Sequence, residues 1–143
     1  MEIHNKMYIL RDMRDLKQKE IATILGVSQS NYSRWENNTE YIPLTKLNTL
    51  CNYYKVSMDY IFSFSEINNY KYKKELSRKE VGSNLKRFRK KYNITQVELA
   101  DMLNTTQSTI SAYEAGETMI LTSFALYLVD KFSISLDKLC NRQ

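Results

Sequence analysis

Apolar residues recur along most of the chain at intervals of three and four, the spacing of one face of an α-helix. Leu44, Leu47, Leu50 and Tyr54 follow this spacing most clearly, and Pro43 stands where such a helix begins. Shorter segments with the same period precede and follow them. Because this helical spacing recurs in most of the chain, the pattern predicts an all-α fold.

Local chemistry places the breaks between the predicted helices. A helix with Ile21 and Leu25 on its apolar face ends at Gly26, which suits a left-handed turn, and Ser28 is a good cap for the helix that follows. In that third helix the apolar residues are three apart and face inward. The opposite face then carries Gln29, Ser30, Ser33 and Arg34.

The same arrangement occurs twice. A shift of 78 residues aligns 16–62 with 94–140 without a gap, and twelve of the aligned positions are identical. We therefore expect two tandem five-helix domains, at 1–66 and 77–143, joined by a short linker at 67–76. Ser77 and Glu80 form a capping-box signature for the first helix of the second copy.

Composition agrees with a helical, globular protein. The 143 residues include only 3 glycines and 1 proline, with 43% hydrophobic and 26% charged residues. The longest apolar stretch, 119–129, falls short of the roughly twenty residues that a membrane span needs. With no readable secretory signal and with Cys51 and Cys140 far apart in apolar patterns, we expect reduced core thiols and a cytoplasmic location.

Positive charge is concentrated in the linker and in the first helix of the second copy. The net charge is +5, and a basic run in the second copy comprises Lys86, Arg87, Arg89, Lys90 and Lys91. Apart from Arg89, this run permits two interpretations, contact with DNA phosphates or a solvated helix face. In the linker, tyrosines alternate with lysines, which fits a flexible segment or one that follows a nucleic-acid groove.

Each copy contains a helix-turn-helix signature. It has a small residue at the helix crossing, Ala22 or Ala100, and a turn residue four positions later, Gly26 or Asn104. Through KQKEIATILGVSQSNYSRWENN and TQVELADMLNTTQSTISAYEAG the sequence resembles the lambda-repressor-like, or Cro/C1-type, helix-turn-helix family of phage and bacterial regulators. The resemblance implies that the third helix of each copy enters the major groove of DNA.

Side-chain chemistry supports base reading, because Gln pairs bidentately with adenine and Arg with guanine. The candidate DNA-binding residues of the first copy are Gln18, Ser28, Gln29, Ser30, Asn31, Ser33, Arg34, Asn37 and Asn38. Those of the second copy are Gln96, Thr106, Gln107, Ser108, Thr109 and Ser111. The second copy has Ala112 where the first has Arg34, so it has lost a long donor.

The family resemblance assigns two further roles. It implies that Gln18 and Gln96, at the start of the second helix, hold a DNA phosphate; plain helix capping is the alternative. It also implies internal ion pairs between Arg11 and Glu36 and between Arg89 and Glu114. These pairs are interpreted as structural.

The predicted function is that of a transcriptional regulator, a repressor, that binds double-stranded DNA. The protein is expected to be bacterial or phage-encoded, cytoplasmic and associated with the nucleoid. No enzyme, metal or cofactor is expected, since His4 is the only histidine and no glycine-rich phosphate loop exists. The alternative is an antitoxin or adaptor in which one copy binds a protein partner. A homodimer also remains open.

Overall fold

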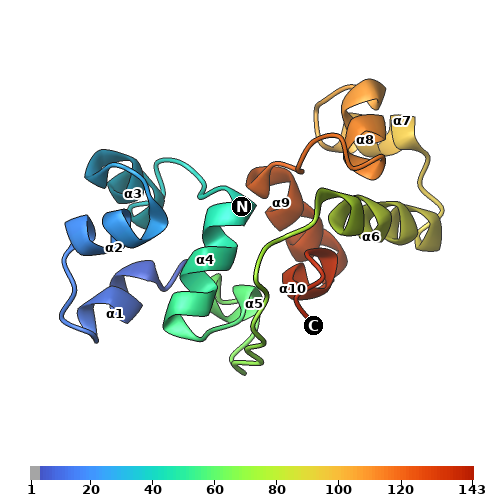
Figure 1. Ribbon diagram of the computed structural model, residues 1–143. Coiled ribbons are helices and arrows are strands. Elements are labelled where there is room, and N and C mark those ends of the chain that lie inside the picture. Colours follow the sequence, from blue (N-terminus) through green and yellow to red (C-terminus); the bar gives the residue numbers. More distant parts are fainter. Residues whose placement is uncertain (1–3) are drawn as a thin grey trace. The chain divides into compact units, whose positions relative to one another are not determined.

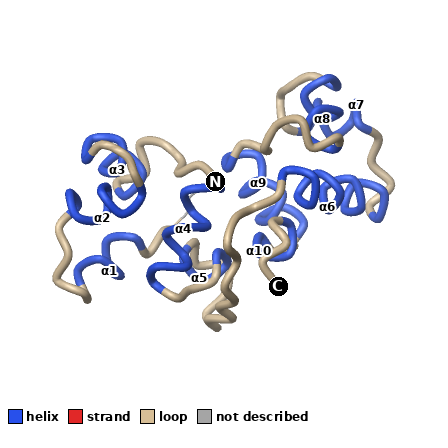
Figure 2. Tube along the Cα trace, viewed as in Figure 1, coloured by secondary structure: helices blue, strands red, loops and turns tan. Residues whose placement is uncertain are grey.

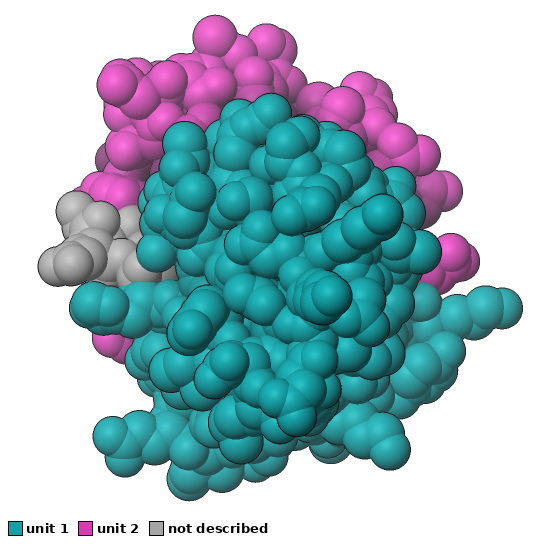
Figure 3. Space-filling view, turned by 90° about the vertical axis from the view of Figure 1, so that its left-hand side faces the viewer, with its two compact units in different colours: residues 1–74 teal, residues 75–143 magenta. Residues whose placement is uncertain are grey.

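The computed structural model describes residues 4–143, which form ten α-helices and no strand (Figure 2). The all-α prediction is confirmed. The chain divides into two compact units, 1–74 and 75–143 (Figure 3). Residues 1–3, which the predicted first domain includes, lie outside the described residues. No helix within 4–143 is long and apolar enough to cross a membrane.

The first unit consists of five helices around one core (Figure 1). They are α1 (Met7–Asp12), α2 (Gln18–Leu25), α3 (Gln29–Glu36), α4 (Leu44–Tyr54) and α5 (Met58–Ile61). The core combines Ile21 from α2, Tyr32 from α3 and Leu47 from α4, all fully buried. These are positions that the helical period places inward.

The second unit repeats this order with a longer first helix (Figure 1). Its helices are α6 (Arg78–Lys91), α7 (Gln96–Met102), α8 (Gln107–Glu114), α9 (Thr122–Phe132) and α10 (Leu136–Leu139). The Oγ of Ser77 accepts a hydrogen bond from the Glu80 amide at 3.2 Å, so α6 begins at the predicted cap. Cys51 and Cys140 are buried and form no disulfide, as expected for core thiols.

Left-handed backbone recurs at the same positions in both units. Among the described residues, the positive-φ positions form pairs 78 residues apart: Asp15/Asn93, Gly26/Asn104, Asn38/Gly116, Lys55/Ser133 and Ser63/Asn141. Gly and Asn tolerate this conformation, so Gly26 and Asn104 make the same turn by different means. The duplication read from the sequence is thus a duplication of backbone geometry.

Part of the predicted linker is bound to the first unit. The side-chain amides of Asn48 and Asn52 donate to the Lys73 carbonyl at 2.9 and 2.7 Å. The Asn68 Oδ1 accepts a hydrogen bond from the Ser57 amide at 2.9 Å. These bonds differ from the expectation of a flexible segment, because they hold residues 68 and 73 against α4 and the start of α5.

Candidate nucleic-acid interface

In the first unit, α2 and α3 meet across a tight turn. Ala22 is almost fully buried, and Gly26 has a φ of 69°, which lets the chain reverse directly into α3. The Oγ of Ser28 accepts from the Asn31 amide at 3.2 Å and caps α3. Because Tyr32 and Trp35 are buried, the polar face of α3 points outward.

Most predicted site residues of this unit are open to solvent. The exposed ones are Ser28, Gln29, Ser30, Asn31, Asn37 and Asn38, and the half-buried ones are Gln18, Ser33 and Arg34. Asn38 has a φ of 65° and accepts from Asn5 Nδ2 at 2.6 Å, which fixes the loop after α3. All of these residues except Gln18, which begins α2, therefore lie between the N-cap of α3 and the loop that follows α3.

Arg34 has partners within its own unit. Its Nη1 donates to Asn31 Oδ1 at 3.0 Å, and its Nε lies 3.8 Å from Glu40 Oε1. Sequence reasoning missed Glu40, which lies outside the helix-turn-helix signature in the loop before α4. The contact is exposed and therefore weak, but it holds a negative charge beside the predicted guanine-reading side chain.

In the second unit, α7 and α8 form the same turn around Asn104, whose φ is 59°. The Thr106 side chain caps α8 by accepting from the Thr109 amide at 3.3 Å. Exposed predicted residues are Thr106, Gln107, Ser108 and Ser111, and half-buried ones are Gln96 and Thr109. Gln107 Nε2 lies 3.4 Å from Gln96 Oε1, a weak contact between the two helices.

A family model described as helix-turn-helix matches the chain twice, at residues 7–61 and 85–139. Together the two matches cover well over half of the sequence. The chain belongs to the helix-turn-helix family. The family consists of Cro/C1-type DNA-binding regulators, as the sequence motifs indicated. Comparisons with curated proteins and with solved structures gave no match.

A buried ion pair joins α1 to the end of α3 in the first unit. Arg11 Nε and Nη2 donate to the two Glu36 oxygens at 2.8 and 3.2 Å, and the two side chains are only 15% and 7% exposed. Burial alone would raise the pKa of the Glu36 carboxyl. Hydrogen bonds from Arg11 and Gln18 outweigh burial and hold that pKa below its ordinary value.

The second unit contains the same pair. Arg89 Nε and Nη2 donate to Glu114 at 2.6 and 3.0 Å, and the Glu114 carboxyl again has a lowered pKa because the Arg89 and Gln96 bonds outweigh its burial. Both predicted pairs are confirmed. They fix the orientation of α3 and α8 relative to the first helix of each unit.

Gln18 and Gln96 contact these pairs rather than cap their helices. Gln18 Nε2 donates to Glu36 at 2.6 Å, and Gln96 Nε2 donates to Glu114 at 3.1 Å. The N-cap of α7 is Thr95, whose side chain accepts from the Glu98 amide. Capping by the glutamines themselves is therefore the wrong alternative. Each amide instead links the buried carboxylate to the outer surface.

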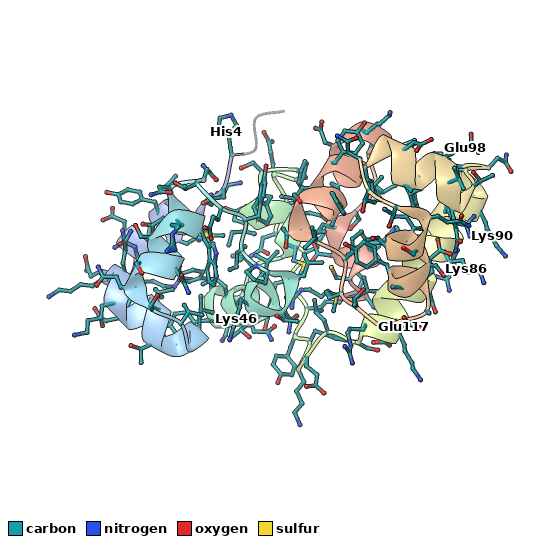
Figure 4. The ribbon with its side chains drawn as sticks, turned by 90° about the horizontal axis from the view of Figure 1, so that it is seen from above. His4, Lys46, Lys86, Lys90, Glu98 and Glu117 are labelled. Atoms are coloured by element: carbon teal, nitrogen blue, oxygen red, sulfur yellow. The ribbon has the colours of Figure 1, made fainter. Side chains whose placement is uncertain are left out.

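Beside Gln96 and Gln107 the second unit has a hollow of about 530 Å³. Its lining includes Lys90 from the end of α6 and Asn93, which has a φ of 55°. Lys86 and Lys90 project from successive turns of α6 (Figure 4). Sequence reasoning missed Asn93, although its match with Asp15 marks the same left-handed position.

In residues 4–143 no group of three metal-binding side chains occurs.

Proposed function

We propose that this helix-turn-helix protein is a sequence-specific repressor in which the two units contribute differently to DNA binding. In this proposal the first unit reads bases, and the second unit holds the phosphate backbone. The observation that carries the proposal is the difference between α3 and α8. At the same position α3 has Arg34, which can contact guanine, and α8 has Ala112, which cannot.

Base reading by the first unit is supported by its exposed amides and guanidinium. Gln29 and Asn31 offer paired donor and acceptor groups that match adenine, and Arg34 matches guanine. All three lie on the outer face of a helix whose other face is buried. A helix of this kind fits the width of the major groove.

Phosphate binding by the second unit is supported by charge. Lys90 lines the hollow beside the first residues of α7 and α8, and Lys86 lies one turn earlier on α6. The aligned residues of the first unit are Tyr8 and Asp12, which offer no cation. Compared with the first unit, the second unit therefore has more positive charge where it would face a duplex and lacks a base-reading arginine.

The operator can be identified by selecting bound duplexes from a random pool, with the mass of the complex measured in solution. Its sequence preference should be asymmetric, strong in the half-site that α3 contacts and weak in the half-site that α8 contacts, because Ala112 replaces Arg34 in α8. Affinity for the selected duplex and for an unrelated duplex is then compared by fluorescence anisotropy across a salt series. Failure to bind any duplex at low ionic strength would refute DNA recognition altogether.

Two double variants separate the proposed roles. Gln29→Ala/Arg34→Ala should reduce affinity for the selected duplex by about 2–6 kcal/mol, at 1–3 kcal/mol per bidentate contact, and leave the unrelated duplex little affected. Lys86→Gln/Lys90→Gln should weaken both duplexes alike and reduce the salt slope by about one per lost phosphate contact. The charge-matched control is Arg87→Gln/Lys91→Gln, on the other side of α6.

The alternative is an adaptor or antitoxin in which the second unit binds a protein. The absence of a long donor at Ala112 favours this reading of α8. Gln107→Ala/Ser108→Ala distinguishes the two functions. The adaptor is supported if Gln107→Ala/Ser108→Ala changes neither affinity nor sequence preference. Lys86→Gln/Lys90→Gln should then also leave the salt slope unchanged.

A further inference from the structure

The basic residues of α6 lie on two different sides of the helix. Gly82 and Arg89 face α8, because a Cβ on Gly82 would meet the Tyr113 carbonyl and because Arg89 bonds Glu114. Arg87 and Lys91 are displaced from these residues by roughly half a turn of the helix, at about 100° per residue. They consequently point away from α8, unlike Lys86 and Lys90.

On that other side the second unit has a groove of about 440 Å³ between α6 and the segment that leads into α10. We call it the basic groove. Its rim carries Arg87, Lys91 and Lys138, and its floor includes Phe88, Tyr92 and Leu139. All three rim cations are exposed, and the lining contains no acidic side chain.

Two lining residues of the basic groove, Phe88 and Tyr92, belong to an aromatic cluster that also includes Phe132 behind them. Phe88, Tyr92 and Phe132 have ring centroids 5.0 Å apart in each of the three pairs. Phe88 is buried, while 38% of Tyr92 remains exposed, with Lys91 Nζ 5.8 Å from its ring centre. Such a surface suits an apolar or aromatic side chain that has negative charge on either side of it.

The rim is held in position by one amide. Asn84 Oδ1 accepts from Arg87 Nη1 at 2.9 Å. Asn84 Nδ2 donates to the carbonyls of Lys138 and Leu139 at 3.0 and 3.2 Å. These bonds connect α6 to the end of α10 and orient Arg87 beside Lys138, so less side-chain freedom is lost on binding.

The first unit shows that the fold does not require these cations. At the positions aligned with Arg87, Lys91 and Lys138 it has Ile9, Met13 and Tyr60. Ile9 and Met13 are exposed, so neither is needed for the core. The positive rim is therefore a property of the second copy alone, which points to a ligand rather than to folding.

We propose that the basic groove binds an acidic peptide segment of a partner protein, with carboxylates on Arg87, Lys91 and Lys138 and an aromatic or apolar side chain against Tyr92. Charge complementarity selects the acidic partner, and the exposed ring selects the apolar residue between the charges. Because the groove lies on the side of α6 opposite α8, a duplex held by α8 leaves it accessible. The regulator can then bind DNA and a protein together.

The test uses the full chain and a fluorescein-labelled peptide of alternating Asp and Glu around a central Trp-Leu, followed by anisotropy. Saturable binding is expected, and it should be lost when Asn and Gln replace the peptide's acids. Arg87→Gln/Lys91→Gln/Lys138→Gln should weaken binding roughly tenfold, since each exposed ion pair contributes modestly. Lys86→Gln/Lys90→Gln changes the charge on the other side of α6 and should leave peptide binding nearly unchanged.

A second measurement separates this proposal from DNA binding. With a saturating duplex present, the peptide should still bind, and the triple variant should retain its duplex affinity and salt slope. Displacement of the peptide by duplex, or a reduced salt slope in the triple variant, would assign the groove to DNA and overturn the proposal. Absence of peptide binding, or equal loss in both charge variants, would also overturn it, whatever the outcome for base reading.

Discussion

Replacing Glu36 with Gln tests how far the first helix-turn-helix unit depends on its buried ion pair. The carboxylate accepts hydrogen bonds from Arg11, from Gln18 at 2.6 Å and from the Tyr32 hydroxyl at 3.2 Å. Breaking a buried pair by removing one partner costs roughly 3–5 kcal/mol. Arg11 is 15% exposed and keeps a bond to the Leu16 carbonyl at 2.7 Å, so we expect about 3 kcal/mol.

The second unit supplies a matched control. Glu114→Gln breaks the equivalent pair with Arg89, but the residue aligned with Tyr32 is Ile110, which has no hydroxyl. Glu114 accepts one hydrogen bond fewer than Glu36 does, so its replacement should cost less, by up to about 1 kcal/mol. A smaller cost for Glu114→Gln is the result expected if the Tyr32 hydroxyl supports the carboxylate.

The assay exploits the chain's only tryptophan. Trp35 lies in α3 next to Glu36, so its fluorescence during urea unfolding reports on the first unit, while circular dichroism reports on both. Glu36→Gln should move the fluorescence transition, and Glu114→Gln should move only the circular dichroism. DNA affinity is measured where both units remain folded. A shift of the Trp35 transition by less than about 1 kcal/mol would refute the stabilising role of the pair.

Three other perturbations have outcomes set by the structure. The lowered pKa of Glu36 contributes stability that is fully present above the ordinary carboxyl pKa of 4.5 and is lost as the pH falls through the pKa of the folded state. Glu36→Gln should flatten this pH dependence of stability in a fluorescence titration. Gly82→Ala should destabilise the second unit by about 1–3 kcal/mol in thermal melts, because its Cβ would meet the Tyr113 carbonyl; a stabilised variant would mean looser packing of α6 on α8. Lys55→Gly should raise the stability of the first unit by about 1 kcal/mol, because Lys55 has a φ of 57°; an unchanged urea midpoint would contradict this.

Much of the fold could be predicted from sequence because its determinants are local. Gly26 and Asn104 both tolerate a left-handed turn, and Ser28 and Ser77 are efficient caps, so helix boundaries followed from single residues. The ion pairs could be predicted because the same charges recur 78 residues apart and the family resemblance assigns their partners. Helical period alone then determined which face of each helix is buried.

Features that depend on distant neighbours could not be predicted. Lys73 accepts hydrogen bonds from α4, which the composition of the linker does not suggest, because the donors belong to another segment. The contact of Arg34 with Glu40 depends on the path of a loop. The basic run of α6 looked like a single feature, whereas Arg87 and Lys90 lie on different surfaces, which only the packing of α6 against α8 determines.

The duplication provides an internal comparison between folding and recognition. Arg11 and Arg89 are the same residue in the same buried geometry, so that position is constrained by the fold itself. Arg34 and Ala112 occupy the same backbone position, as do Met13 and Lys91, yet their chemistry differs completely. Two copies of one scaffold can differ at such positions without loss of stability only where the side chain does not support the core. Such differences mark surfaces that the fold leaves open to change, as the proposal requires if the two units bind different parts of one complex.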